Sequence, residues 1–527
     1  MKQILYILLG IMLLSIVSCY DDEGNYDYHD INEVTFGEIN TMYNVLLNID
    51  TLKIDVGDFV EMSQGDLTDT DRFEYLWVIF SPSDSHVKDT ISTDRVLSYP
   101  VTLAPGTYNL YLKIRDRVTE VQWKKQFTVT VGTPYSRGIL LMGEDANGNA
   151  DAQMISMAGI DTLILKDILK NSGLPTLHGP VSFLHTGKQG EDYRQIWVLT
   201  ESGSYYLDRE TLQGSESNVF DNFLLESYNE PMIPVTIVPQ PSDIDGKVES
   251  QRAVVCSNGK LFYTSLSILA YGMYSFPLNC LKTDMTKYIP ASEYLFYSIQ
   301  SFKKFIWYSG ETNRFYKTES YLYPYSDTLE QKSTDAFPWD QKGTGRTLIY
   351  GENTWNEAKA WVCDGNSFAL MGDGTNAYIY KFYVNNMEAK SMYEITSNVA
   401  SDILTADFYA FSSTRSVLFY VKNNVLYAYN YDKGNERVET IPLETTDQIT
   451  MLKFDLTMEP MKDALFIATY NTAEGGTLRK YYVGNNPDKV ELKADPTAVW
   501  KGLTKVKNMR WRAVLKMRRW GAFEDMN

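Results

Sequence analysis

The chain of 527 residues is poor in the side chains that build metal sites, disulfides and most catalytic centres. It contains four cysteines and four histidines. So few cysteines exclude a disulfide-stapled scaffold, and no pair of histidines has the spacing of a zinc site. The sequence also lacks a GxSxG nucleophile elbow, a GxxxxGK[ST] phosphate loop and a dinucleotide fingerprint. We therefore expect no cofactor and no metal site, and the sequence identifies no catalytic residue.

Positive charge is also scarce. Lys and Arg number 49 against 67 Asp and Glu, so the formal net charge is −18. Because binding to phosphate backbones needs a basic surface, the sequence argues against a nucleic-acid partner. After the N-terminal segment no stretch reaches 18 apolar residues, the length that a membrane-spanning helix needs.

The N-terminal segment has the pattern of a secretory signal. Lys2 precedes an apolar run, Ile4 to Val17, which is too short to span a bilayer. The run ends in Ile-Val-Ser-Cys, which resembles a bacterial lipobox. We expect residues 1–18 to be a signal peptide and Cys19 to carry acyl chains such as palmitate, so that the mature chain is anchored to a membrane. An ordinary signal peptide with an incidental cysteine is the alternative.

Residues 19–33 follow as an acidic tether. Three consecutive acids, Asp21, Asp22 and Glu23, stand just behind the cysteine. This arrangement resembles the surface-export signal of Bacteroidetes lipoproteins, which implies lipid anchoring in the outer membrane with the chain facing the cell exterior. A solvated, flexible linker is the other interpretation.

Residues 34–132 alternate between apolar and polar positions with period two. Such alternation over short runs separated by turns predicts antiparallel strands, and a region of this length fits a small Ig-like β-sandwich. We expect Trp77 to be the core indole. Tyr108, just after Gly106 at the start of a late strand, resembles the corner of PKD and other Ig-like domains. The clearest segments are LKIDVGDFV (52–60), FEYLWVIF (73–80), YNLYLKIRD (108–116) and QFTVTV (126–131).

Residues 133–527 contain a recurring unit of hydrophobic strand, polar turn and Tyr-rich strand. Seven such hairpins recur at a spacing of about 50–60 residues, which suits blades of four strands each. We therefore predict an all-β chain, a PKD/Ig-like sandwich followed by a seven-bladed β-propeller. The hairpins are centred near residues 145, 202, 259, 311, 374, 424 and 474.

Two further segments complete the predicted propeller. The hydrophobic segment VKNMRWRAVLKM (506–517) is expected to supply the strand that completes the first blade and closes the ring. DTLILKDILKNSG (161–173) has the period of a short amphipathic helix inserted between strands.

Aromatic residues in predicted loops are the candidate ligand contacts. Tyr323 and Tyr325 crowd the segment YLYPYS, Trp339 follows shortly, and Trp355 lies in another connection. Exposed aromatic rings stack on sugars or anchor protein partners. The alternative is that these rings cover the edges of the blades.

The lipobox, the tether, the segments YLWVI and GTYNLYLKIRD, and the opening GILLMGED together resemble PKD-like lipoproteins of Bacteroidetes nutrient-uptake loci. The resemblance covers residues 16–145. It implies an accessory lipoprotein beside a Sus-type outer-membrane transporter and its lid lipoprotein. The resemblance implies no catalytic residue. Cys19 is the one residue to which it assigns a role, as the position that carries the lipid.

Three functions remain open. The first is a binding or assembly module, not an enzyme, that presents a propeller face to an oligomeric glycan or peptide, where tethering lets weak binding suffice. The second is a propeller hydrolase that cuts a captured polymer. The third is a purely structural partner of the transporter.

Overall fold

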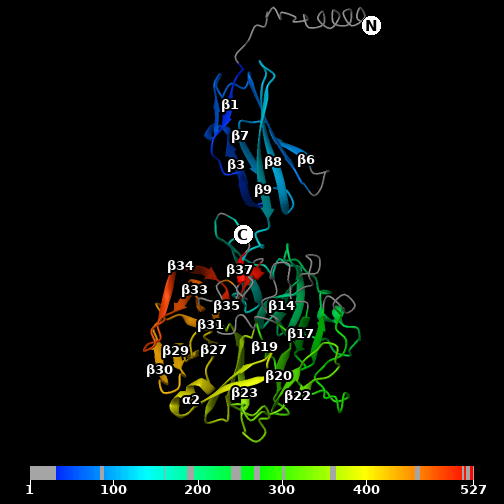
Figure 1. Cartoon of the computed structure of the whole chain (residues 1–527), viewed down its shortest axis with the longest axis vertical. Helices are drawn as coiled ribbons and strands as arrows, with labels where there is room; N and C mark the ends of the chain where they lie inside the picture. Colours follow the sequence, from blue (N-terminus) through cyan, green and yellow to red (C-terminus); the bar gives the residue numbers. More distant parts are fainter. Residues whose placement is uncertain are drawn as a thin grey trace, which may run out of the picture. The chain divides into compact units, whose positions relative to one another are not determined.

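The chain folds into two compact units, with the boundary between Val131 and Gly132 (Figure 1). The sequence had placed it one residue later. No helix of the described residues is long and apolar enough to cross a membrane. The computed structural model describes residues 31–82, 88–159, 161–186, 195–238, 251–265, 273–299, 302, 304–356, 364–456, 458, 463–512, 515–517 and 523–525.

The first unit is a β-sandwich. Its strands form a five-stranded sheet, ordered β2-β9-β8-β5-β6, and two pairs, β3-β7 and β1-β4. A single turn of 3-10 helix, Val56–Asp58, separates β3 from β4. The strands are β1 (Val34–Phe36), β2 (Met42–Leu46), β3 (Thr51–Asp55), β4 (Val60–Met62), β5 (Phe73–Phe80), β6 (Lys88–Ser92), β7 (Val96–Pro100), β8 (Gly106–Asp116) and β9 (Gln122–Gly132).

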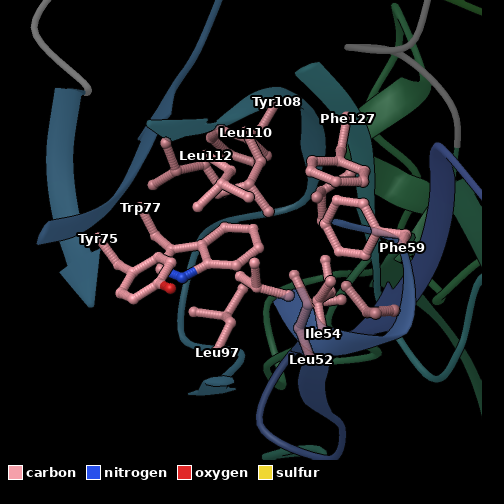
Figure 2. Packing of buried hydrophobic residues seen from close by; sticks show 14 of the residues in the cluster. Leu52, Ile54, Phe59, Tyr75, Trp77, Leu97, Tyr108, Leu110, Leu112 and Phe127 are labelled. Atoms are coloured by element: carbon pink, nitrogen blue, oxygen red, sulfur yellow. The ribbon is translucent and has the colours of Figure 1, made fainter. Parts of the chain in front are cut away.

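The sandwich core forms where alternate residues of β5, β8 and β9 meet those of β3 and β7 (Figure 2). Trp77 is fully buried there, with its ring centroid 6.0 Å from that of Phe127. Its Nε1 donates to the carbonyl of Asp94 at 2.9 Å, so the indole is buried with its polar atom satisfied. The Tyr108 hydroxyl donates to the carbonyl of Ala104 at 2.7 Å, the backbone contact typical of a tyrosine corner.

Among its described residues the second unit contains seven successive sheets of three or four strands and one further two-stranded sheet. Sheets 1 and 4 to 7 have four strands, and sheets 2 and 3 have three. Sheet 1 contains β10 (Gly138–Glu144), β11 (Ala150–Ser156) and β12 (Leu163–Leu165), sheet 2 contains β13 (Pro180–Thr186), β14 (Gln195–Thr200) and β15 (Gly203–Asp208), and sheet 3 contains β16 (Pro234–Val238), β17 (Gln251–Cys256) and β18 (Leu261–Ser265). Sheet 4 contains β19 (Leu295–Tyr297), β20 (Phe305–Ser309), β21 (Arg314–Thr318) and β22 (Asp327–Thr328), and sheet 5 contains β23 (Thr347–Thr354), β24 (Asn366–Gly372), β25 (Ala377–Tyr383) and β26 (Glu388–Ile395). Sheet 6 contains β27 (Phe408–Phe411), β28 (Val417–Lys422), β29 (Val425–Asn430) and β30 (Arg437–Ile441), and sheet 7 contains β31 (Gln448–Phe454), β32 (Ala464–Asn471), β33 (Gly475–Val483) and β34 (Leu492–Leu503).

Each of the seven hairpins expected from the sequence is present as an antiparallel strand pair. They are β10-β11, β14-β15, β17-β18, β20-β21, β24-β25, β28-β29 and β32-β33. Their turn residues include Asn423 and Asn424, both at positive φ, in the tight turn between β28 and β29. Asparagine tolerates this left-handed backbone better than most residues, which explains a two-residue connection there.

The fourth strand of the first sheet comes from the far end of the chain. Strand β35 (Lys505–Arg512) pairs antiparallel with β10, as expected for the segment beginning at Val506. The segment's last residues form β36 (Leu515–Met517), which pairs separately with β37 (Phe523–Asp525). The backbone just before β35 passes very close to Gly476 of β33. A Cβ on Gly476 would lie 2.0 Å from the carbonyl oxygen of Thr504, so a residue with a side chain does not fit there.

Neighbouring sheets are joined by seven hydrophobic clusters. Each cluster draws buried residues from two consecutive sheets, and the last draws them from sheet 7 and sheet 1. In that last cluster Phe466 of β32 packs with Ile139 of β10 and Trp511 of β35. A twisted sheet buries both faces only between two neighbours, so this packing is that of a β-propeller.

The predicted helix at 161–173 is wrong. Leu163–Leu165 instead form β12, which pairs with β11 as the outer strand of sheet 1. Its apolar residues therefore cover a sheet edge, and their helical spacing is coincidental. The buried carboxylate of Asp151 fixes the following turn by accepting from the backbone N–H of Leu169 at 2.9 Å. The α-helix of the described residues is α2 (Ser397–Leu404), between sheets 5 and 6, which the sequence did not indicate.

Candidate functional site

A central cavity of about 610 Å³ opens between the seven sheets. Its lining takes residues from β13, β16, β19, β23, β27, β31 and β35, the edge strand of each sheet in turn. The volume lies in the range of small-molecule sites. The cavity is therefore a property of the whole ring, since no one sheet forms more than part of its wall.

Three tyrosines from consecutive sheets form one side of the wall. The rings of Tyr294 and Tyr350 lie 5.7 Å apart, and those of Tyr350 and Tyr409 lie 5.2 Å apart. Each ring is partly exposed and lines the cavity. Burial raises the pKa of all three phenols, that of Tyr409 to about 12, so they stay neutral at physiological pH.

Glu352 lies two residues beyond Tyr350 on β23 and also lines the cavity. One of its carboxyl oxygens accepts from the backbone N–H of Phe411 at 2.7 Å, which links sheets 5 and 6. Burial raises the pKa of Glu352 to about 8, although the hydrogen bonds from Phe411 and Tyr350 and the charge of Lys453 favour the carboxylate. Gly351 between them faces the other way, where a Cβ would lie 2.8 Å from the Phe296 ring.

Lys453 brings an ammonium group to the cavity from β31. Its Nζ donates to Oδ1 of Asn508 at 2.6 Å and to the carbonyl of Met509 at 2.9 Å, both on β35. Asn508 in turn donates to the carbonyl of Val181 on β13 at 2.8 Å, so the chain of contacts crosses sheets 7, 1 and 2. Burial and the nearby positive charge of Arg510 lower the pKa of Lys453 to about 7, against the attraction of Glu352 and Asp455.

These contacts give the polar side chains of the cavity two roles. They join neighbouring sheets near the axis, and they hold an acid and an amine with pKa values near neutrality beside a common cavity. Buried groups with such pKa values are more frequent at functional sites than elsewhere. Among the described residues no ion pair joins Glu352 to Lys453, so the two side chains do not bind each other directly.

The exposed pair of predicted ligand contacts lies outside the cavity. Tyr323 is 50% exposed, and its ring stacks on that of Tyr325 at a centroid distance of 5.6 Å. The ammonium of Lys282 lies 5.7 Å from the centroid of the Tyr325 ring. The two tyrosines therefore form a small aromatic stack on the surface, with Tyr323 as its exposed member.

The structure corrects the placement of the two tryptophans. Trp339 is 2% exposed and packs edge-on against Phe315 and Phe382, between sheets 4 and 5. Trp355 is 1% exposed and belongs to the cluster between sheets 3 and 4. The gap between blades is where so large an apolar surface is best removed from water, so neither indole presents a face to a ligand in solution.

Sequence reasoning did not single out the cavity residues. Their one local signal is the pair Tyr350 and Glu352, which share a face of strand β23. Lys453 and Asn508 are 55 residues apart in sequence and meet through their strands. Cys19 lies outside the described residues. Cys256 and Cys280 are buried free thiols, and Cys363 is not described.

One comparison with known proteins matches the N-terminal part of this architecture. Residues 19–179 match the sequence model of the PKD-like family. No curated protein matches the sequence significantly. Thus the family match extends from the predicted lipidation site through the sandwich into sheet 1.

Solved structures resemble the chain only weakly. A quinonprotein alcohol dehydrogenase-like protein from Bacteroides thetaiotaomicron is 13% identical, with a TM-score of 0.34, over 92% of this chain and 100% of that one. PorZ, a surface component of the type-IX secretion system of Porphyromonas gingivalis, is 12% identical, with a TM-score of 0.30, over 75% of this chain and 44% of that one. Similarity at this level says nothing about function. The N-terminal third of the chain is thus similar to the PKD-like family, and the chain as a whole joins a PKD-like sandwich to a β-propeller.

Proposed function

We propose that this protein is a lipid-anchored binding module on the outer face of the outer membrane. It captures an oligomeric nutrient, a glycan or a peptide, beside a Sus-type transporter and its lid lipoprotein. The lipobox and acidic tether support the location, and the family match that starts at Cys19 supports the mature N-terminus. The lipid keeps the binding site near the transporter, so that weak affinity suffices.

The observation that carries the binding role is the central cavity. It combines a volume of about 610 Å³, three partly exposed tyrosine rings and a small number of polar groups held by neighbouring strands. Sites for small ligands have this composition, mostly apolar or aromatic walls with a few fixed polar contacts. The surface stack of Tyr323 and Tyr325 is a second contact for a long ligand.

Blocking the cavity tests this function. Ser182, a small partly buried residue of β13, lines the cavity. Ser182→Trp is expected to abolish oligosaccharide or peptide binding in calorimetry, because the indole fills the space that the ligand needs. Tyr323→Ala serves as the matched variant outside the cavity, with an expected loss of threefold or less for short ligands, roughly the cost of one exposed contact. Unchanged binding in a folded Ser182→Trp protein would exclude the cavity as the site.

Hydrolysis of the captured polymer is the second candidate, and Glu352 is the observation that favours it. A carboxylic acid that stays protonated near neutral pH can give its proton to a leaving group while water attacks the bond. This function requires released product that disappears in Glu352→Gln. Binding without product in the unmodified protein would decide for the binding module.

A further inference from the structure

The charges around the cavity are unevenly distributed. Its described lining contains four carboxyl groups and two amines. The amines belong to Lys453 and Lys507, and the carboxyl groups to Glu201, Glu293, Glu352 and Asp407. Even with Glu352 protonated, three acids remain against two amines, so an anionic ligand would meet more repulsion than attraction on entering.

Both amines already have partners within the protein. Lys507 forms an ion pair with Glu144 at 3.4 Å. Lys453 uses two of its three N–H bonds on Asn508 and on the carbonyl of Met509. Strong binding of a carboxylate, sulfate or phosphate needs a cation that can approach it. Both cations of the described lining are already bound to other groups of the protein.

The three tyrosine rings lie close together at the cavity wall, and one of their hydroxyls is bound within the protein. The Tyr409 hydroxyl donates to the carbonyl of Ile403 at 2.6 Å. The carboxyl group of Glu352 lies near the hydroxyl of Tyr350, and that of Glu293 lies near the hydroxyl of Tyr294, and each raises the pKa of the neighbouring phenol. Because the Tyr409 hydroxyl is bound to the protein, its ring is fixed before a ligand arrives, and the negative faces of these rings can attract polarised C–H groups.

Carboxyl groups therefore stand directly beside the rings. Glu293 is next to Tyr294, and Glu352 is next to Tyr350. A sugar ring matches this pattern, since its C–H face packs on an aromatic ring while its hydroxyls donate to neighbouring carboxyl oxygens. A peptide backbone offers one donor per residue and no such apolar face.

We propose that the cavity selects a neutral, hydroxyl-rich glycan segment and discriminates against anionic glycans. This rests on the proposed binding function and names its substrate class. Glu293 and Asp407, which are exposed at the cavity wall, repel acidic sugars. The tyrosines and Glu352 make the productive contacts deeper in the wall.

Calorimetry with the full-length lipoprotein in detergent tests this selectivity. The neutral probes are xylohexaose, mannohexaose and cellohexaose; the anionic probe is hexagalacturonate; the cationic probe is chitosan hexamer; and hexaalanine represents a peptide. We expect at least one neutral probe to bind at least roughly tenfold more tightly than hexagalacturonate, the effect of like charges held near the ligand.

Charge-removing variants test the cause. The double variant Glu201→Gln with Asp407→Asn, which neutralises two exposed acids of the lining, is expected to tighten hexagalacturonate binding roughly fivefold while leaving the neutral probe within about twofold. Asp402→Asn, on the exposed side of α2 and outside the cavity lining, is the control for net charge and should change neither.

The outcomes separate this inference from the function beneath it. Equal or tighter binding of hexagalacturonate or hexaalanine would overturn the selectivity and leave the binding module intact, whereas the same acidic lining predicts that chitosan hexamer binds more tightly than hexagalacturonate. Failure of every probe to bind would overturn both. If the double variant and Asp402→Asn bind hexagalacturonate with the same affinity, the charge of the cavity does not discriminate against anionic glycans.

Discussion

Glu352 shows how the surroundings of a single residue change the protonation of its side chain. A carboxyl group on the surface is ionised at neutral pH, but burial at the cavity wall raises the pKa of this one from 4.5 to about 8. The group is kept there by a hydrogen bond from the backbone of the next sheet. Its position therefore follows from the packing of sheets 5 and 6.

The raised pKa predicts a pH dependence of stability. Between about pH 4.5 and 8 the folded chain holds a proton on Glu352 that the unfolded chain has lost. Stability conferred by protonated Glu352 is therefore complete below pH 4.5 and falls as pH rises toward 8. In thermal unfolding, Glu352→Gln should gain stability relative to the unmodified protein as the pH rises from 5 to 8, by about 3 kcal/mol.

Two features make this comparison specific. The lowered pKa of Lys453 works in the opposite direction above pH 7, where the folded chain binds fewer protons than the unfolded one, and this effect is larger in Glu352→Gln because the attraction of Glu352 is lost. Glu61→Gln, which changes an exposed carboxyl of the sandwich, is the matched control. The raised pKa of Glu352 would be contradicted if the difference in stability between Glu352→Gln and the unmodified protein did not vary with pH.

At the scale of elements, strand β35 decides whether the second unit holds together. It supplies the edge strand of sheet 1 and buries Val506, Met509 and Trp511 against sheets 7 and 1. Burial of three such side chains stabilises the fold by at least about 5 kcal/mol, comparable with the whole stability of many domains. Lys453 and the cavity also depend on β35 through Asn508.

Truncation after Leu503, which removes β35, should therefore unfold the second unit. We expect rapid proteolysis of residues beyond Gly132 and loss of the corresponding thermal transition. Truncation after Arg512 keeps β35 and is the matched control, with a melting temperature close to that of the full chain. Equal protease resistance of the two truncated proteins would show that β35 does not hold the ring.

For the whole molecule, the decisive feature is the proposed attachment at Cys19. Acyl chains add about 0.8 kcal/mol for each buried CH₂ group, and stable anchoring requires more than one chain. The two folded units contribute no helix able to cross a membrane within the described residues. The proposed lipid anchor predicts that membrane association depends on Cys19.

Cys19→Ala is expected to move the protein from the membrane fraction to the soluble fraction and to abolish labelling by radioactive palmitate. Cys280→Ala, at a buried thiol in the second unit, is the control that should remain in the membrane fraction. Digestion of the unmodified protein by protease added to intact cells checks the outward orientation. Retention of Cys19→Ala in membranes after a salt wash would reject the lipid anchor.

The fold was largely predictable because its signals are local. Period-two alternation identified the strands around Trp77, and Tyr-rich hairpins marked the repeating unit at all seven places where a strand pair is found. The segment around Val506 could be recognised as a closing strand from its apolar pattern. Local periodicity failed at Leu163–Leu165, where three apolar residues fit a helix and a strand equally well.

The site was not predictable in this way, since it exists only once the sheets meet. Strand pattern and repeat spacing, which the chain encodes over a few residues at a time, determined the all-β architecture and its two parts. Tertiary packing alone decided that Trp339 and Trp355 are buried and that Tyr350, Glu352 and Lys453 share a cavity. The physical reason is that burial and pKa depend on neighbours contributed by other sheets, which no single segment contains.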